Sequence, residues 1–223
     1  MDIDKERTIG ALAVEHPLAT RVFARHGIDF CCGGGQPLAA ACASRGLDPD
    51  TLIEEIRKEL AGTPETGRRW DEAPLGELVD HILENYHKPL YEELPRLERM
   101  AAKVYDVHHD KAEEMLHGML TTYRGLKAEL DEHFAKEEQI LFPMIRAGRG
   151  AMTGGPVSVM VEEHESAGAA LARLRALTSG YEVPAEACNT WRALWHGLAA
   201  LEASLHEHIH LENNILFPRA LAS

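Results

Sequence analysis

The sequence predicts an all-α fold, in which a four-helix bundle follows a small helical N-terminal domain. Through residues 75–223, apolar side chains recur every three or four positions, as they do on helices buried along one face. No segment shows the convincing alternation of a β-strand. Two stretches, HFAKEEQILFP at 133–143 and HIHLENNILFP at 208–218, are near copies of each other. Long helices with short connections pack as a bundle.

Composition excludes several classes of function. The chain of 223 residues has a formal net charge of −13, whereas nucleic-acid binding needs Lys and Arg to neutralise phosphates. No apolar run is long enough to span a membrane, and the first residues lack the layout of a signal peptide. The cysteines do not resemble a disulfide framework, so we expect a cytoplasmic protein. They are Cys31, Cys32, Cys42 and Cys188.

The small N-terminal domain is expected over residues 1–60. Short helices are predicted over 18–26, 37–44 and 49–60. The first of them stops at Gly27, because glycine commonly follows the end of a helix. The last starts favourably, since Asp48 is a good N-cap acceptor and Pro49 fits the first turn.

A linker is predicted over residues 61–74, a polar stretch interrupted by Gly62, Pro64 and Gly67. The bundle should therefore occupy residues 75–223. Its four helices are expected over 75–107, 111–145, 155–178 and 184–222.

The two near-identical stretches each place a histidine four residues before a glutamate. Residues four apart lie on the same face of an α-helix, so each stretch presents a nitrogen and a carboxylate one turn apart. The other two helices each carry one histidine within the apolar stripe. The candidate metal ligands are therefore His87, His133, Glu137, His164, His208 and Glu212.

A pair of metal ions explains this pattern better than ordinary core packing. Two glutamates buried without partners would destabilise the core by several kcal/mol, and coordination removes that penalty. Two bridging carboxylates, with two imidazoles on each ion, suit iron or manganese. Zinc is less favoured, because its structural sites prefer Cys ligands and a closed tetrahedron. Such a centre leaves room for a bridging oxygen and a small exogenous ligand.

The element Cys-Cys-Gly-Gly-Gly begins at Cys31 and Cys32. Adjacent cysteines rarely form a good disulfide, because the ring that they close is strained. Exposed thiols on a glycine-rich turn could bind iron, accept nitrosyl groups or cycle through disulfides. The alternative is a pair of half-buried cysteines at a helix end. We expect Cys42 and Cys188 to be small core residues.

Several motifs together resemble those of known proteins. They are Tyr86-His87, Glu-Glu-His at 162–164, and the two His-x-x-x-Glu elements that lead to Ile-Leu-Phe-Pro. The bundle resembles hemerythrin-like domains. Residues 8–221 resemble the RIC (repair of iron centres) family of di-iron proteins, which place a Cys-Cys domain before such a bundle. The resemblance implies two carboxylate-bridged iron ions, and damaged iron–sulfur proteins as partners.

A hemerythrin-type site would suggest a fifth histidine ligand, for which His108 is the candidate. It lies 21 residues after His87 on what looks like one helix, which is roughly 30 Å at 1.5 Å per residue. We therefore expect His108 to lie at the loop between the first two helices, away from the metal ions.

Three functions fit these features. The first is repair of iron–sulfur clusters damaged by nitrosative or oxidative stress, by iron delivery. The second is a scavenger or sensor that binds nitric oxide or dioxygen at the metal ions. The third is a nitric oxide reductase with Cys31 and Cys32 as thiol partners. The cysteine-bearing domain favours the first and third, because a carrier needs only the bundle. A homodimer is compatible with each.

Overall fold

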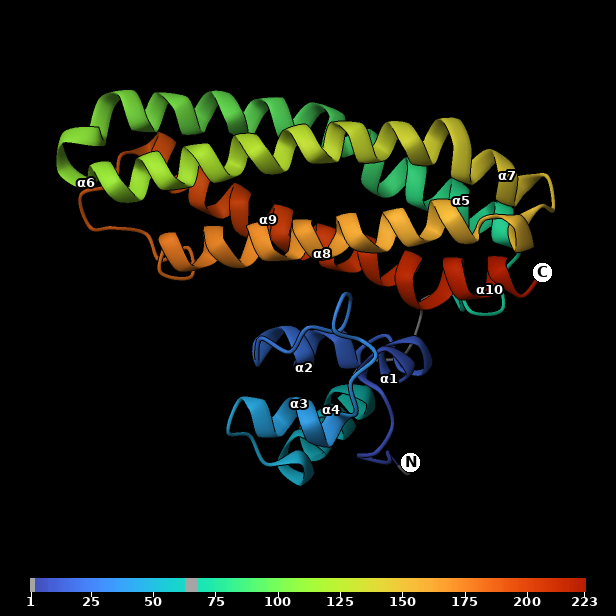
Figure 1. Ribbon diagram of the computed structural model, residues 1–223. Coiled ribbons are helices and arrows are strands. Elements are labelled where there is room, and N and C mark those ends of the chain that lie inside the picture. Colours follow the sequence, from blue (N-terminus) through green and yellow to red (C-terminus); the bar gives the residue numbers. More distant parts are fainter. Residues whose placement is uncertain (1–2, 63–67) are drawn as a thin grey trace.

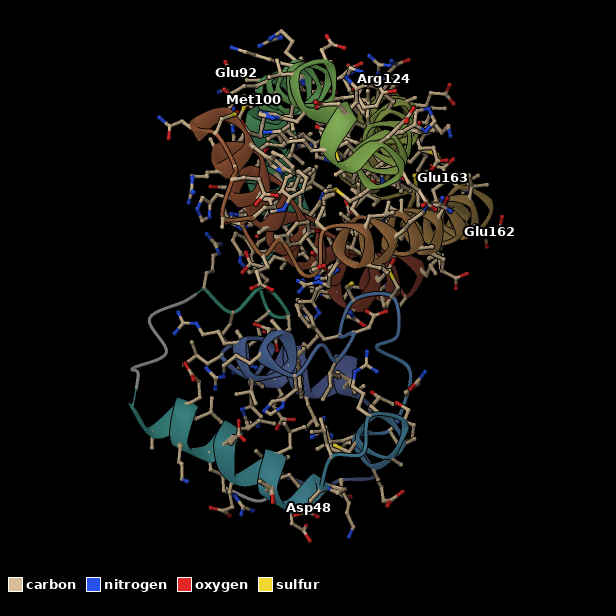
Figure 2. All side chains as sticks on the ribbon, turned by 90° about the vertical axis from the view of Figure 1, so that its left-hand side faces the viewer. Asp48, Glu92, Met100, Arg124, Glu162 and Glu163 are labelled. Carbon is tan, nitrogen blue, oxygen red and sulfur yellow. The ribbon has the colours of Figure 1, made fainter. Side chains whose placement is uncertain are left out.

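The computed structural model describes residues 3–62 and 68–223, which form helices joined by turns and loops (Figure 1). The all-α prediction is confirmed, since the only β-type pairing within these ranges is an isolated bridge between Thr8 and Pro37. The long helices form an elongated bundle, and the short N-terminal helices pack beneath it (Figures 1 and 2). No helix in the described ranges is long and apolar enough to cross a membrane.

The N-terminal unit consists of α1 (Ile9–Glu15), α2 (Ala19–Arg25), α3 (Leu38–Ser44) and α4 (Pro49–Gly62). The side chains of Thr8 and Asp48 each accept a hydrogen bond from a backbone N–H in the first turn that follows, so they cap α1 and α4. These helices enclose an apolar cluster that includes Phe23, Leu38 and Ile56. The unit therefore has its own small core.

The bundle contains α5 (Leu75–Ile82), α6 (Lys88–Lys136), α7 (Phe142–Arg146), α8 (Gly154–Leu177), α9 (Asn189–Leu211) and α10 (Phe217–Leu221), with a short 3-10 turn η3 (Gly150–Met152). Three π-helical turns, η1 (Leu83–His87), η2 (Glu137–Leu141) and η4 (Glu212–Leu216), join successive α segments. Each π turn continues the helix on either side of it, so the bundle retains four long arms (Figure 1).

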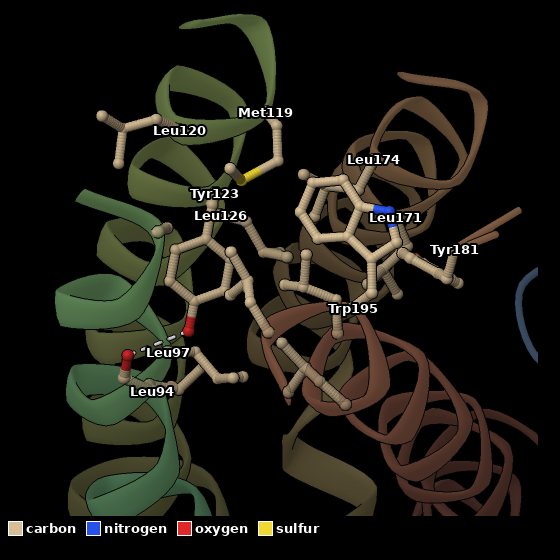
Figure 3. Close-up of a cluster of buried hydrophobic side chains, with 14 of the residues drawn as sticks. Leu94, Leu97, Met119, Leu120, Tyr123, Leu126, Leu171, Leu174, Tyr181 and Trp195 are labelled. Atoms are coloured by element: carbon tan, nitrogen blue, oxygen red, sulfur yellow. Dashed lines mark hydrogen bonds between the residues drawn. The ribbon is translucent and has the colours of Figure 1, made fainter. Parts of the chain in front are cut away.

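α6 reverses its direction near Ala112, whose backbone angles (φ −153°, ψ 53°) lie outside the helical region. The two antiparallel arms that result form the first two helices of the bundle (Figure 1). The sequence placed this connection at residues 108–110, slightly too early. The hydroxyl of Tyr123 links the arms by donating a hydrogen bond to the Leu94 carbonyl (2.9 Å; Figure 3).

The fourth arm begins at Asn189, later than the predicted start at residue 184. The preceding loop contains Ser179, Gly180 and Tyr181, all of which have positive φ. A left-handed backbone conformation cannot continue a right-handed helix. The loop therefore ends α8 and turns the chain back before α9 can start.

A large apolar cluster fills the bundle between the α6 turn and the level of the candidate metal ligands, and Figure 3 shows part of it. Trp191 and Trp195 are almost fully buried there, and their rings meet edge to face at 5.7 Å. Fully burying a Leu or Phe side chain contributes about 1.5–3 kcal/mol. This cluster therefore contributes a large part of the free energy that holds the four arms together.

The N-terminal unit packs directly on the C-terminal arm of the bundle. Asn214 donates a hydrogen bond to the Phe30 carbonyl (3.1 Å), and Ile209 belongs to the N-terminal apolar cluster. A Cβ atom at Gly10 would overlap the Asn214 side chain, so this close approach requires glycine. The segment around Phe30 is thereby held against α9 and η4.

The proposed boundary at residues 61–74 can be tested with a fragment. Residues 63–67 of that linker lie outside the described residues. After them, Arg219 donates hydrogen bonds to the carbonyls of Trp70 (2.7 Å) and Ala73 (2.6 Å), which tie this segment to the bundle. We expect a chain starting near Trp70 to show a helical circular dichroism spectrum and to bind metal. An insoluble or metal-free fragment would mean that the two regions fold as one cooperative domain.

Candidate metal centre

The six candidate ligands come from all four arms of the bundle, and three of them lie at π turns. η1 ends at His87, η2 begins at Glu137 and η4 begins at Glu212. The other three are the histidines of α6, α8 and α9. A π turn widens the helix by one residue and changes the direction of the side chains that follow, and such turns are frequent at functional sites.

These side chains form two groups that share both glutamates. The first contains His87, Glu137, His208 and Glu212, and the second contains His133, Glu137, His164 and Glu212. Within each group, one ligand atom from every residue lies within 4.8 Å of the others. Nε2 of His87 is 3.3 Å from Oε2 of Glu137, and Nε2 of His208 is 3.0 Å from Oε1 of Glu212. Each carboxylate is thus placed between two histidine pairs.

Burial of these groups is nearly complete. Each of the six is at most 3% exposed, and both glutamates are at 0%. Both oxygens of Glu137 and Oε2 of Glu212 accept no hydrogen bond from the described residues. A buried carboxylate that lacks donors is strongly unfavourable. These oxygens therefore require a positively charged partner.

Hydrogen bonds on their outer nitrogens orient two of the imidazoles. Nδ1 of His87 lies 2.8 Å from Oε1 of Glu138, and Nδ1 of His133 lies 2.9 Å from Oε2 of Glu163. Because an ionised carboxylate only accepts, both Nδ1 atoms carry a proton. The Nε2 atoms point inward, where facing pairs approach to 3.3 and 3.1 Å. Two lone pairs at such distances repel unless a cation or a proton lies between them.

The electrostatics of the site favour an ionised carboxylate. Burial alone would raise the pKa of Glu212, but the charges of His208 and His164, which approach its two oxygens to 3.0 and 3.2 Å, hold it well below the usual range. Burial likewise opposes a charge on His164, yet the adjacent carboxylate of Glu212 raises the pKa of His164 to about 9. Glu212 is therefore ionised at neutral pH, which is the form that binds metal.

This donor set fits two metal ions. Sharing two carboxylates between the two histidine pairs offers each ion two nitrogen donors and two oxygen donors. That combination suits iron or manganese better than the thiolate-rich structural sites of zinc. The cations would also satisfy the glutamate oxygens that accept no hydrogen bond from the described residues.

A small cavity adjoins the centre. Its volume is about 10 Å³, and its wall includes Glu129 together with His133, His164 and His208. This is about the space that one water molecule needs. The site therefore has room beside the candidate ligands for about one water molecule.

Asp29 organises the turn that carries the two adjacent cysteines. Its Oδ1 accepts hydrogen bonds from the backbone N–H groups of Cys31 (3.0 Å) and Cys32 (2.9 Å) and lies 3.2 Å from Sγ of Cys31. The two sulfur atoms are 3.8 Å apart, and both are free thiols. These three side chains form a further group whose ligand atoms lie within 4.8 Å of one another.

The cysteine turn contacts the candidate metal centre at His164. Sγ of Cys32 lies 3.3 Å from the backbone carbonyl oxygen of His164. Asn213 bridges the two regions, because its Oδ1 lies 2.8 Å from Nδ1 of His164 and its Nδ2 donates to the Cys31 carbonyl (3.4 Å). Tertiary packing thus places the turn beside the second ligand group.

The two thiols differ in acidity. A hydrogen bond from Cys31 lowers the pKa of Cys32 against the effect of burial, and the charge of His164 assists. The same hydrogen bond, together with burial, raises the pKa of Cys31. When Cys32 is ionised, it cannot donate a hydrogen bond to the His164 carbonyl, and its sulfur instead accepts one from the Cys31 thiol. Cys32 is the better metal ligand and nucleophile of the pair.

The remaining cysteines differ from each other in burial. Cys42 is buried as expected, but the expectation of a buried Cys188 is wrong, since this residue is exposed. It occupies the N-cap of α9 and not a helical face, because the helix starts only at Asn189. His108 lies 3.3 Å from the Cys188 sulfur, and its ring packs at a tilt against that of Trp191. It belongs to neither of the two ligand groups.

Glu138 and Asn213 hold histidines in place, although the sequence did not indicate these partners. Each residue directly follows a candidate glutamate, Glu137 or Glu212, at the start of a π turn. Each supports a histidine on a different arm. Their position after the glutamates in the two near-identical stretches was the only signal in the sequence, and it does not specify a partner.

Loss of an outer hydrogen bond should weaken metal binding. Glu163→Ala removes the acceptor for Nδ1 of His133 and an ion pair with Lys136. Loss of such a partner typically weakens metal binding about 10- to 100-fold. We expect a decrease in metal affinity within this range, measured by competition with a chelator. Glu162→Ala is the matched control, because Glu162 is the exposed neighbour on α8 (Figure 2). Equal metal retention by both variants would contradict this role for Glu163.

A four-arm bundle with two histidine groups that share both glutamates defines a hemerythrin-type cation-binding protein. Residues 78–220 match the family described as Hemerythrin HHE cation binding domain. Residues 5–60 match a second family, described as Domain of Unknown function (DUF542).

The chain is similar to curated relatives over nearly their whole length. The chain is 45% identical to the iron–sulfur cluster repair protein YtfE of Pectobacterium atrosepticum over 97% of both chains. It is 45% identical to the protein of the same name from Escherichia coli O81 over 98% of both, and 44% identical to that of Dickeya chrysanthemi over 97% of both. The chain therefore belongs to the family of iron–sulfur cluster repair proteins.

Proposed function

We propose that this protein repairs iron–sulfur clusters damaged by nitrosative or oxidative stress, and that it does so by delivering iron. The contact between the cysteine turn and the candidate metal centre carries the proposal, since Cys32 lies 3.3 Å from the His164 carbonyl. A protein that only carried a small ligand at the metal would need the bundle alone. The names of relatives that match nearly the whole chain support the same role.

The bundle would hold two iron ions through the six candidate ligands, with both glutamates bridging. Bound there, the ions would supply redox chemistry and open positions for a small ligand. Glu138, Glu163 and Asn213 would keep the imidazole lone pairs directed inward by accepting the Nδ1 protons. Iron is favoured over zinc because the donors are imidazole and carboxylate, and the bundle has space beside them.

In this proposal, iron is the cargo, and the cysteine turn is the first group of ligands that the iron would meet on leaving the bundle. Asp29, Cys31 and Cys32 offer one hard and two soft donors within 4.8 Å of one another. Asn213 connects the two sites, because one end of its amide holds His164 and the other end holds the Cys31 carbonyl. A movement of the turn would therefore loosen the His164 imidazole.

A second candidate function is the binding of nitric oxide or dioxygen by a scavenger or sensor. The small cavity beside His133, His164 and His208 favours it, because it leaves some open space next to the candidate ligands. This function would leave the cysteine turn without a role.

We also propose a cytoplasmic location, with damaged iron–sulfur proteins as partners. The four cysteines are free thiols, and such thiols persist in reducing compartments. The charge of −13 gives no basis for nucleic-acid binding.

Metal analysis and Mössbauer spectroscopy of freshly purified protein test the metal assignment. We expect two irons per chain with the spectrum of a coupled pair. A reconstituted assay tests the role, and the protein should reactivate an iron–sulfur enzyme that nitric oxide has damaged. A single ion or zinc would contradict the centre. Tight, reversible nitric oxide binding without reactivation would favour the scavenger.

A further inference from the structure

At the end of the bundle where α6 turns back, far from the candidate metal centre, a thiol and an imidazole form a pair. Nε2 of His108 lies 3.3 Å from Sγ of Cys188. The separation from His87 along the first arm of α6 is roughly 30 Å at 1.5 Å per residue. We propose that Cys188 and His108 form a reactive thiol site that undergoes disulfide exchange with small disulfides and becomes S-thiolated.

The accessibility of the two groups suits this chemistry. Cys188 is an exposed residue, so its side chain lies at the surface, where a small disulfide can approach it. His108 is only 8% exposed, and its ring packs on Trp191 with centroids 5.0 Å apart. The imidazole is therefore held in place against the bundle, with Nε2 directed at the sulfur. A nucleophile within hydrogen-bond reach of a fixed base is the arrangement that activates thiols.

The backbone around Cys188 adds to this effect. Cys188 is the N-cap of α9, a helix of 23 residues, and its side chain makes no capping hydrogen bond. The N-terminus of a helix favours a nearby negative charge. The guanidinium of Arg192 folds back over the same turn and donates hydrogen bonds to the carbonyls of Ala187 (3.0 Å) and Ala185 (3.3 Å). The helix N-terminus and the guanidinium on the same turn thus both favour a negative charge on Cys188.

The exchange step is balanced without another oxidant. His108 accepts the thiol proton at Nε2, and the Cys188 thiolate attacks one sulfur of a disulfide R–S–S–R. A new S–S bond forms to Cys188 while the old S–S bond breaks, and the leaving R–S⁻ takes up the proton. Cys188 is oxidised to a mixed disulfide, and one half of the small disulfide is reduced to a thiol.

The test follows modification of the full-length protein by oxidised glutathione at neutral pH. Mass spectrometry of the Cys188 peptide gives its rate separately from the other cysteines. An ordinary cysteine is only a few per cent thiolate at pH 7, so activation leaves room for roughly tenfold acceleration or more. We expect Cys188 to react at least about tenfold faster in the folded chain than in urea, and His108→Ala to remove most of that advantage.

Two further variants separate a chemical role of His108 from a structural one. His108→Phe keeps a ring against Trp191 and should be as slow as His108→Ala, whereas added imidazole should partly restore the rate of His108→Ala. His109→Ala, which changes the exposed neighbour on the same helix, should react like the wild type. A Cys188 rate equal to that of the unfolded chain, or a wild-type rate in both His108 variants, would overturn the proposal.

Discussion

Replacing Glu212 by alanine should remove most of the iron from the purified protein. Glu212 belongs to both ligand groups and is completely buried, so the variant deprives each ion of one oxygen donor. Loss of partners that only support a ligand already weakens metal binding about 10- to 100-fold, and loss of a shared ligand should do more. We expect less than about a tenth of the wild-type iron after gel filtration, measured by elemental analysis. Glu137→Ala should behave in the same way.

Two controls distinguish lost coordination from misfolding. His108→Ala should keep nearly all of the iron, because His108 contacts Cys188 and Trp191 and lies outside both groups. In metal-free protein, Glu212→Ala should keep the helical circular dichroism spectrum of the wild type but should melt at a lower temperature, since it leaves the buried imidazoles of His208 and His164 without their carboxylate partner. Full iron content in both glutamate variants would refute the ligand set. Iron loss in His108→Ala would contradict the position of His108 away from the metal ions.

Replacing both adjacent cysteines by alanine should abolish repair without removing the metal. The cysteine turn contacts His164 only through its backbone carbonyl and through Asn213, and neither contact supplies a donor to the two ligand groups. We therefore expect Cys31→Ala/Cys32→Ala to retain its iron and to fail in reactivating a nitric-oxide-damaged iron–sulfur enzyme. The wild type should reactivate that enzyme, whereas Glu212→Ala should not.

Single variants sharpen this prediction. The hydrogen bond between the two thiols lowers the pKa of Cys32 and raises that of Cys31. Cys32→Ala should therefore lose more activity than Cys31→Ala. Cys42→Ala is the matched control, because Cys42 is a free thiol in the core of the same N-terminal unit. Equal reactivation by the double variant and the wild type would exclude the thiols from the mechanism. In that case, the remaining candidate would be binding of a diatomic ligand at the bundle.

Local sequence patterns predicted the architecture and the inward direction of the candidate ligands. The four-residue spacing of His133 and Glu137 places both on one helix face wherever that helix lies in the molecule. His87 and His164 could be found because each occupies the apolar stripe of an amphipathic helix, and both are buried. These features depend on the period of a single helix, so they can be read from the sequence.

Tertiary structure alone decided which groups meet. The partners of the imidazoles, Glu138 and Asn213, lie on arms other than those of the histidines that they hold. The contact of Cys32 with His164 joins residues that are 132 positions apart in the chain. The exposure of Cys188 follows from where the loop after α8 allows α9 to start. The sequence period specifies which side chains share a helix face, but how far each arm is shifted along its neighbours is fixed only when all four arms and the N-terminal unit pack together.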